Sequence, residues 1–354
     1  MLDFLSTGTL LTNIRTISVT RYAPIQSVPV YLAEDFSVTN GANLGDAVAP
    51  MDELMLDDVY GMATDARTWR LGIEAMEDGG FRIAGDTETG QPGAALHLDC
   101  ALSLMSPDGH TTDAIVLVEL DTTGHIAELY LLPLAPLLPK TDYTLVGVDR
   151  DRAGQKFAQV ACVSFTRGTH ITLGSGAQVR IEDLKVGDRV LTRDDGVREV
   201  RWIGQTTVRA MGEFAPIVIR AGTLNNENDL VVSPDHRLFV YQRRDEIGVG
   251  RPELLVKARH LVNGDTVFVQ EGGFVDYFQL LFDRHHIIYA EGIAAETMLL
   301  DPRTRPALPQ EMLEQVSPLL DQHASGEGHG MDVAKALLDR PDAIDLLKRA
   351  STKR

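Results

Sequence analysis

The chain has 354 residues, 44% of them hydrophobic, which suffices for about two globular domains with buried cores. Its formal net charge of −18 at pH 7 argues against binding to nucleic acid or to anionic membrane surfaces. Two cysteines imply no disulfide framework, and no apolar run is long enough for a signal peptide or a membrane span. We therefore expect a cytoplasmic protein by default, with non-classical export left open.

Residues 1–156 are predicted to form an N-terminal all-β domain. Turn signals such as Asn40-Gly41 and Asp108-Gly109 separate short apolar or alternating runs. These runs cover residues 14–22, 28–32, 68–73, 95–100, 114–120, 125–132 and 143–148. Strands at this spacing favour a compact domain, for example a sandwich. We find no catalytic constellation in it, and its scattered histidines are interpreted as solvated or edge-strand residues.

Residues 157–301 continue the pattern of short strands and turns, beginning with one predicted strand over 157–165. After Asp301-Pro302 the pattern becomes helical, with helices predicted from Pro309 onward, over 331–339 and over 341–350. We therefore expect a mostly β protein of three parts, in which residues 302–354 form a short helical and partly flexible tail.

Three motifs follow one another in the second part. They are Ser164–Thr169 (Ser-Phe-Thr-Arg-Gly-Thr), Ile181–Leu191 (Ile-Glu-Asp-Leu-Lys-Val-Gly-Asp-Arg-Val-Leu) and Ser233–His236 (Ser-Pro-Asp-His). In this order and at these distances they resemble the Hint domain, the module shared by inteins and the autoprocessing part of Hedgehog proteins. The resemblance covers about residues 164–301 and is greatest to bacterial Hint-domain proteins that are neither inteins nor Hedgehogs. It implies a horseshoe-like β-fold for the second part.

The resemblance also implies an acyl shift at the start of the domain. In Hint domains the first side chain attacks the preceding carbonyl, and a Thr/Ser-x-x-His motif polarises the scissile amide and protonates the departing nitrogen. Ser164 stands at the nucleophile position, so the scissile bond would be Val163–Ser164 and the shift N-to-O. Ser233 and His236 match the Thr/Ser-x-x-His motif.

Further candidates lie late in the domain. The resemblance places Asp283 and His285 where the family often keeps an Asp or His near the reacting bond. Adjacent histidines on a strand point in opposite directions, so His285-His286 does not predict a zinc site, and we expect no metal or cofactor. Cys162 would face the same side as Ser164 and is an alternative nucleophile.

Two classes of function stay open. An active domain would make an ester at Ser164 and release residues 1–163 to water or an outside nucleophile, which is an intramolecular reaction and not a turnover activity. The domain could also be silent, because a hydroxyl needs a base to become a good nucleophile. A silent domain would be a scaffold or binding protein. Residues 291–298 lack the Asn that splicing inteins cyclise. Residues 204–207 lack the acidic residue of sterol-transferring Hedgehog domains, so we expect neither splicing nor a sterol acceptor.

Overall fold

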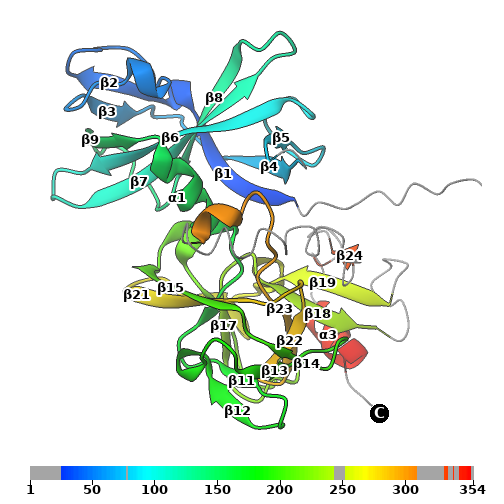
Figure 1. The fold of residues 1–354 in the computed structure, drawn as a ribbon. Helices are drawn as coiled ribbons and strands as arrows, with labels where there is room; N and C mark the ends of the chain where they lie inside the picture. Colours follow the sequence, from blue (N-terminus) through cyan, green and yellow to red (C-terminus); the bar gives the residue numbers. More distant parts are fainter. Residues whose placement is uncertain are drawn as a thin grey trace, which may run out of the picture.

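The computed structural model describes residues 25–76, 79–242, 252–308, 331–333, 338 and 343–351. The predicted strand over 14–22 and the predicted helix that begins at Pro309 lie outside these residues. Within them the chain is mostly β, as predicted, and its two α-helices are α1 (Asp151–Ala161) and α3 (Ala343–Ser351) (Figure 1). No helix in the described part of the chain is long and apolar enough to cross a membrane.

The N-terminal part is one nine-stranded antiparallel sheet with the order β2-β3-β9-β6-β5-β4-β1-β8-β7. An additional pairing of β6 with β7 closes the sheet on itself, so it is a closed ring with an extension and not a sandwich of two sheets. The strands are β1 (Gln26–Leu32), β2 (Phe36–Asn40), β3 (Val59–Met62), β4 (Trp69–Ala75), β5 (Phe81–Ile83), β6 (Ala95–Met105), β7 (Thr111–Leu120), β8 (Ile126–Pro133) and β9 (Tyr143–Asp149).

Strand β6 joins two hydrophobic cores. Leu96 packs in the core that includes Val28 and Val30, whereas Leu102 and Leu104 pack in the second core. A register shift between Leu98 and Cys100 separates these halves. One extra residue in a strand turns the following side chains to the opposite face, so the even-numbered residues change cores at this point.

The predicted strand over 157–165 is wrong, because residues 151–161 form helix α1. Ala153, Phe157, Val160 and Ala161 recur at helical spacing and are buried together against the first of the two N-terminal cores. The Asp149 carboxylate accepts the backbone N–H of Arg152, which stabilises the first turn. The predicted boundary between residues 156 and 157 thus falls within α1.

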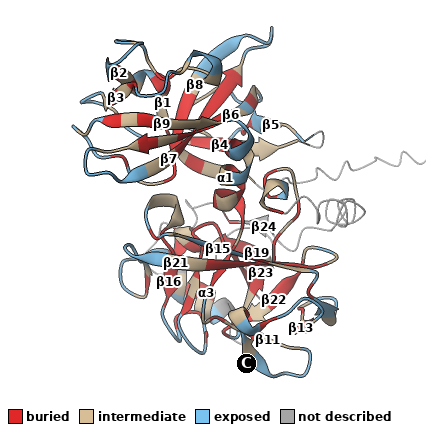
Figure 2. Cartoon of the chain, turned by 60° about the vertical axis from the view of Figure 1, so that its left-hand side comes forward, coloured by how far each residue is buried: buried red, intermediate tan, exposed pale blue. Residues whose placement is uncertain are grey.

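The second part contains two further sheets that share one core (Figure 2). The first consists of β15 (Trp202–Arg209), β21 (Phe274–Leu281), β10 (Phe165–Thr166), β17 (Leu230–Val232), β16 (Ile217–Ile219) and β20 (Val267–Val269), in this order. The other runs β12 (Gln178–Arg180), β11 (His170–Thr172), β22 (Ile287–Ala290), β23 (Ile293–Glu296), β18 (Arg237–Tyr241), β19 (Glu253–Lys257) and β24 (Met331–Asp332). A separate hairpin joins β13 (Arg189–Leu191) to β14 (Val197–Glu199).

The C-terminal residues pack onto this second part. The helix predicted over 331–339 is wrong at its start, because β24 pairs in parallel with β19. Helix α3 lies where a helix was predicted over 341–350. Val333 and Leu347 are buried in the core that the two sheets share, and this burial explains why these residues are attached there.

Candidate functional site

Ser164 lies directly before β10, at the point where the chain leaves α1 and enters the second part. Strand β10 lies between two neighbours, since Phe165 pairs with Val232 of β17 and with Phe278 of β21. The residue that follows β17 is Ser233. The local pairing therefore brings residues from two distant segments of the sequence to Ser164.

Every polar atom of Ser164 has a hydrogen-bond partner. Its backbone N–H donates to Ser233 Oγ at 3.0 Å, and its carbonyl accepts the Ser233 N–H at 2.9 Å. The Gln279 amide donates to Ser164 Oγ at 2.7 Å, and the Ser164 hydroxyl in turn lies 3.4 Å from the carbonyl of Cys162. The side chain is thus buried and fixed next to its own amide nitrogen.

The Ser233–His236 turn is held against the segment that follows β19. The His236 N–H donates to the Ser233 carbonyl at 3.0 Å, which closes the turn. The N–H groups of Ala258 and Arg259 donate to the carbonyls of His236 and Pro234, each at 2.9 Å. This backbone network fixes the positions of the Ser233 hydroxyl and the His236 ring.

The buried His236 ring lies between two carbonyl oxygens. Its Nδ1 is 3.1 Å from the Ser164 carbonyl and its Nε2 is 3.1 Å from the Glu296 carbonyl. A neutral imidazole carries one N–H and can donate to only one of them. Burial lowers the pKa of His236, although the Glu296 carboxylate and both carbonyls act in the opposite direction. The His236 ring therefore contacts the carbonyl oxygen of Ser164, while the Ser233 hydroxyl accepts a hydrogen bond from the backbone nitrogen of Ser164.

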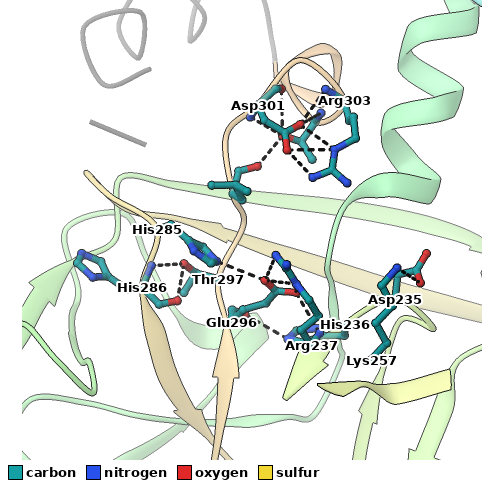
Figure 3. Close-up of polar contacts among 12 residues, drawn as sticks. Asp235, His236, Arg237, Lys257, His285, His286, Glu296, Thr297, Asp301 and Arg303 are labelled. Atoms are coloured by element: carbon teal, nitrogen blue, oxygen red, sulfur yellow. Dashed lines mark hydrogen bonds and ion pairs between the residues drawn. The ribbon is translucent and has the colours of Figure 1, made fainter. Parts of the chain in front are cut away.

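Glu296, at the end of β23, supports this histidine. Its carboxylate accepts the Arg237 N–H at 3.0 Å and the Arg237 Nε at 2.7 Å, and His285 Nε2 lies 3.3 Å away (Figure 3). Burial would raise the pKa of Glu296, but Arg237 and His285 outweigh it and hold the pKa well below its usual range. His285 thus contacts the residue that binds His236.

Asp283 is not part of this cluster. Its carboxylate accepts two hydrogen bonds from Arg201, at 2.8 and 3.0 Å, and its side chain is 42% exposed. His286, the residue after His285, lies with its Nδ1 3.4 Å from the Asp195 carboxylate, whereas His285 contacts Glu296. The two adjacent histidines therefore contact different carboxylates. Asp283 is the one candidate that the structure leaves at the protein surface, in an ion pair.

The alternative nucleophile Cys162 is buried in a small apolar cluster with Leu281, Met298 and Leu300. Burial raises the pKa of its thiol to about 12, so almost none of it is ionised near neutral pH. The thiolate is the reactive form, and the environment of Cys162 therefore disfavours a role as nucleophile.

Sequence reasoning missed two residues of the site, Gln279 and Glu296. Both are polar residues within apolar strand sequences, and that interruption is the signal that could have identified them. Gly204 on the neighbouring strand β15 makes room for both the Trp202 ring and Gln279, because a Cβ there would lie 2.2 Å from the Trp202 ring and 2.5 Å from Gln279 Oε1. The close approach explains a glycine at this position.

A cavity of about 30 Å³ lies beside the candidate scissile bond. Ala161, Val163 and Gln26 line it from the N-terminal side, and Asp235, Arg237 and Lys257 line it from the second part. Its volume exceeds the roughly 10–15 Å³ that one water molecule needs, and its lining is strongly charged. The cavity can therefore hold a small polar molecule next to Val163.

Comparisons with known proteins identify the second part. A model of the Hint domain matches residues 163–302, whereas a search of curated proteins gives no match. Among solved structures, a variant of the Ssp DnaB mini-intein is 11% identical and covers 39% of this chain and 97% of its own, with a TM-score of 0.27. A variant of the gp41-1 intein is 13% identical and covers 38% and 98%, with a TM-score of 0.24. Scores this low carry no weight, and the assignment depends on the domain model and on the motifs within its range. Residues 163–302 of this protein are therefore a Hint domain, and a closed β-sheet domain precedes it.

Proposed function

We propose that this protein carries out an N-to-O acyl shift at Val163–Ser164 and thereby releases its N-terminal domain. The observation that carries the proposal is the pair of hydrogen bonds at Ser164, whose nitrogen is bound by Ser233 Oγ and whose hydroxyl is bound by Gln279. Both reacting groups of one residue are thus held by side chains. In this proposal the N-terminal domain extends through α1, and cleavage separates residues 1–163 from the Hint domain.

The shift is an isomerisation that needs no cofactor. Ser164 Oγ bonds to the carbonyl carbon of Val163, and the bond between that carbon and the Ser164 nitrogen breaks. The Ser164 hydroxyl loses one proton and the new Ser164 amine gains one, so the number of protons on the chain does not change. Ser233 lies 3.0 Å from that nitrogen, so its hydroxyl is in position to deliver the proton. Gln279 donates to the attacking oxygen and would stabilise the negative charge that develops on it.

His236 holds the Ser164 peptide in this arrangement. Its ring lies between the Ser164 carbonyl and the Glu296 carbonyl, 3.1 Å from each, and Phe165 packs against it at 4.4 Å between ring centroids. Acting as the acid that protonates the nitrogen would require the ring to exchange its carbonyl contact for the nitrogen, or to act through Ser233. Either route makes His236 necessary for the shift.

The second step is attack on the ester. Water or another small nucleophile adds to the Val163 carbonyl carbon, the Ser164 oxygen leaves with a proton, and a Val163 carboxylic acid and a free Ser164 amine result. The charged cavity beside Val163 supports a small acceptor, because its volume of about 30 Å³ is far below that of a sterol. Arg237 and Lys257 in its lining would stabilise the new carboxylate.

Hydroxylamine tests the proposal, because it converts an ester at Val163 into a hydroxamic acid and cuts the chain. We expect wild-type protein to be cut after Val163 and Ser164→Ala to stay intact, since alanine has no atom that can accept the acyl group. His236→Ala should slow the cut by about a hundredfold or more if its proton-transfer role holds. Circular dichroism controls for folding, and an equal cut in Ser164→Ala would overturn the proposal.

A silent Hint fold is the second candidate function, and one observation favours it. The Ser164 hydroxyl points toward the Cys162 carbonyl and accepts from an amide, and neither of these neutral groups is a base. A Hint domain with such a site would act as a scaffold or binding module. Wild-type protein that stays intact in hydroxylamine supports this candidate.

A further inference from the structure

The N-terminal domain reaches into the Ser233–His236 turn. Gln26, the first residue of β1, donates from Nε2 to Asp235 Oδ2 at 2.5 Å, and the side chain of Gln26 is buried. Lys257 of the Hint domain donates to the backbone carbonyl of Ile25 at 3.1 Å. Gln26, which precedes the scissile bond by more than a hundred positions, thus contacts the turn that binds Ser164, and its neighbour Ile25 contacts the end of β19.

Asp235 lies within this turn, directly before His236. Its carboxylate is almost fully buried and lies 3.4 Å from Lys257 Nζ (Figure 3). It also lies 3.0 Å from Arg259 Nε. A buried carboxylate needs partners for both oxygens, because an unsatisfied charged group is costly in the interior. The two cations approach Oδ1, and the amide of Gln26 supplies the hydrogen bond to Oδ2.

We propose that Gln26 is a positioning residue of the Hint site, through which the N-terminal domain holds Asp235 and thereby the side chains of Ser233 and His236. The inference rests on the proposed function for its effect on cleavage, but the coupling itself is a property of the fold. Because the contact comes from outside the Hint domain, the site is complete only with its own N-terminal domain in place. The N-terminal domain then acts as a specific partner of the Hint domain and not as an exchangeable passenger.

Two hydrogen bonds connect Gln26 with the site: the bond from Gln26 to Asp235, and the bond that closes the turn containing Asp235. Ser233 and His236 flank Asp235 in a turn closed by the bond from the His236 N–H to the Ser233 carbonyl. Without the bond from Gln26, the Asp235 carboxylate must turn toward Arg259 and Lys257 to satisfy Oδ2. Such a rotation moves the turn, and with it the ring that contacts Ser164.

The test compares Gln26→Ala with Pro306→Ala in the full-length chain. Pro306 lies in the short helix Arg305–Ala307, which follows the Hint domain, and packs on α1 at Gly154, so its substitution loosens a different contact of the N-terminal domain. Two readouts are independent of activity: the nuclear magnetic resonance titration of the His236 ring, and hydrogen exchange of the Ser233 and His236 amides. The third readout is the rate of the hydroxylamine cut.

We expect Gln26→Ala to shift the His236 titration and to speed exchange of the two amides by about tenfold, as the loss of one hydrogen bond to a charged group implies. It should also slow the cut, and Pro306→Ala should leave all three unchanged. Equal effects in the two variants, or none in Gln26→Ala, would overturn the inference. If Gln26→Ala unfolds β1, Gln26→Glu keeps the side-chain length and places a repelling charge against Asp235, with the same expected shifts. An uncut wild type would refute the proposed function, whereas the His236 readouts would still decide this inference.

Discussion

The two domains are both β-rich, but they differ in what they bury. Among the described residues, three of the buried polar side chains lie before Ser164, and eighteen lie from Ser164 to Thr304. The N-terminal domain is therefore built almost entirely on apolar cores. The Hint domain buries many polar side chains as well, among them Ser233, His236, Gln279 and Glu296.

The buried polar groups of the two domains also have different surroundings. In the N-terminal domain, Tyr130 donates to Glu119, whose other oxygen accepts the Gln91 N–H. In the Hint domain, Ser233 and Gln279 bind Ser164 directly, and His236 lies between the carbonyls of Ser164 and Glu296. Buried charges and hydrogen-bonded networks seldom add stability over apolar packing, so their concentration in one domain indicates a site. This difference predicts which substitutions act on stability alone and which also act on cleavage.

The largest expected effect comes from the buried ion pair of the Hint domain. Arg237→Met leaves the Glu296 carboxylate buried without its main partner, which should cost about 3–5 kcal/mol of unfolding free energy. The chain has one tryptophan in each domain, Trp69 and Trp202, so Trp→Phe backgrounds report the domains separately. Urea unfolding followed at Trp202 should shift strongly, and an unchanged transition there would contradict the account of Glu296.

A smaller effect is expected in the N-terminal domain. Tyr130→Phe removes the donor to Glu119 and should cost about 1–3 kcal/mol, because a buried acceptor loses its partner. The transition followed at Trp69 should move, whereas the hydroxylamine cut should keep its wild-type rate. A slower cut in this variant would break the distinction between the two domains.

Gln279→Leu tests the polar network with a smaller stability change. The leucine removes the donor to Ser164 Oγ, which should cost about 1 kcal/mol and slow the cut by about tenfold or more. Thr207→Val, on β15 and paired with the surface carboxylate Asp276, serves as the matched control. The two variants should differ in cleavage far more than in unfolding, and equal cleavage rates would remove Gln279 from the site.

The smallest expected effect is a pH dependence of the Hint domain. Burial lowers the pKa of His236, so the unfolded chain binds its proton at a higher pH than the folded chain does. This contribution to stability is fully present above pH of about 6.5 and is lost as the pH falls through the lowered pKa. His236→Gln should flatten this slope in the Trp202 transition, and an unchanged slope would contradict a neutral, buried ring.

Part of this picture could be predicted from the sequence. Ser164, Ser233 and His236 were identified by the order and spacing of their motifs, and the structure brings the three together. Gln279 and Gln26 join through strand pairing and domain packing, which no local pattern encodes. Residues 157–165 alternate like a strand, but the apolar residues of α1 also recur at helical spacing, and packing against the N-terminal core decides for the helix. Asp283 resembles a site residue only by its position in the sequence. Its partner Arg201 lies in the connection between β14 and β15, and no local sequence pattern predicts that ion pair.

Intact-mass measurement of Ser164→Cys after incubation with hydroxylamine tests the central claim most directly. A thiol is the better nucleophile, so this variant should be cut faster than the wild type. Two species are expected, residues 1–163 ending in a hydroxamic acid and a C-terminal piece that begins at residue 164. A single uncut species in both the variant and the wild type would contradict acyl transfer at Val163–Ser164 and leave the Hint domain as a scaffold.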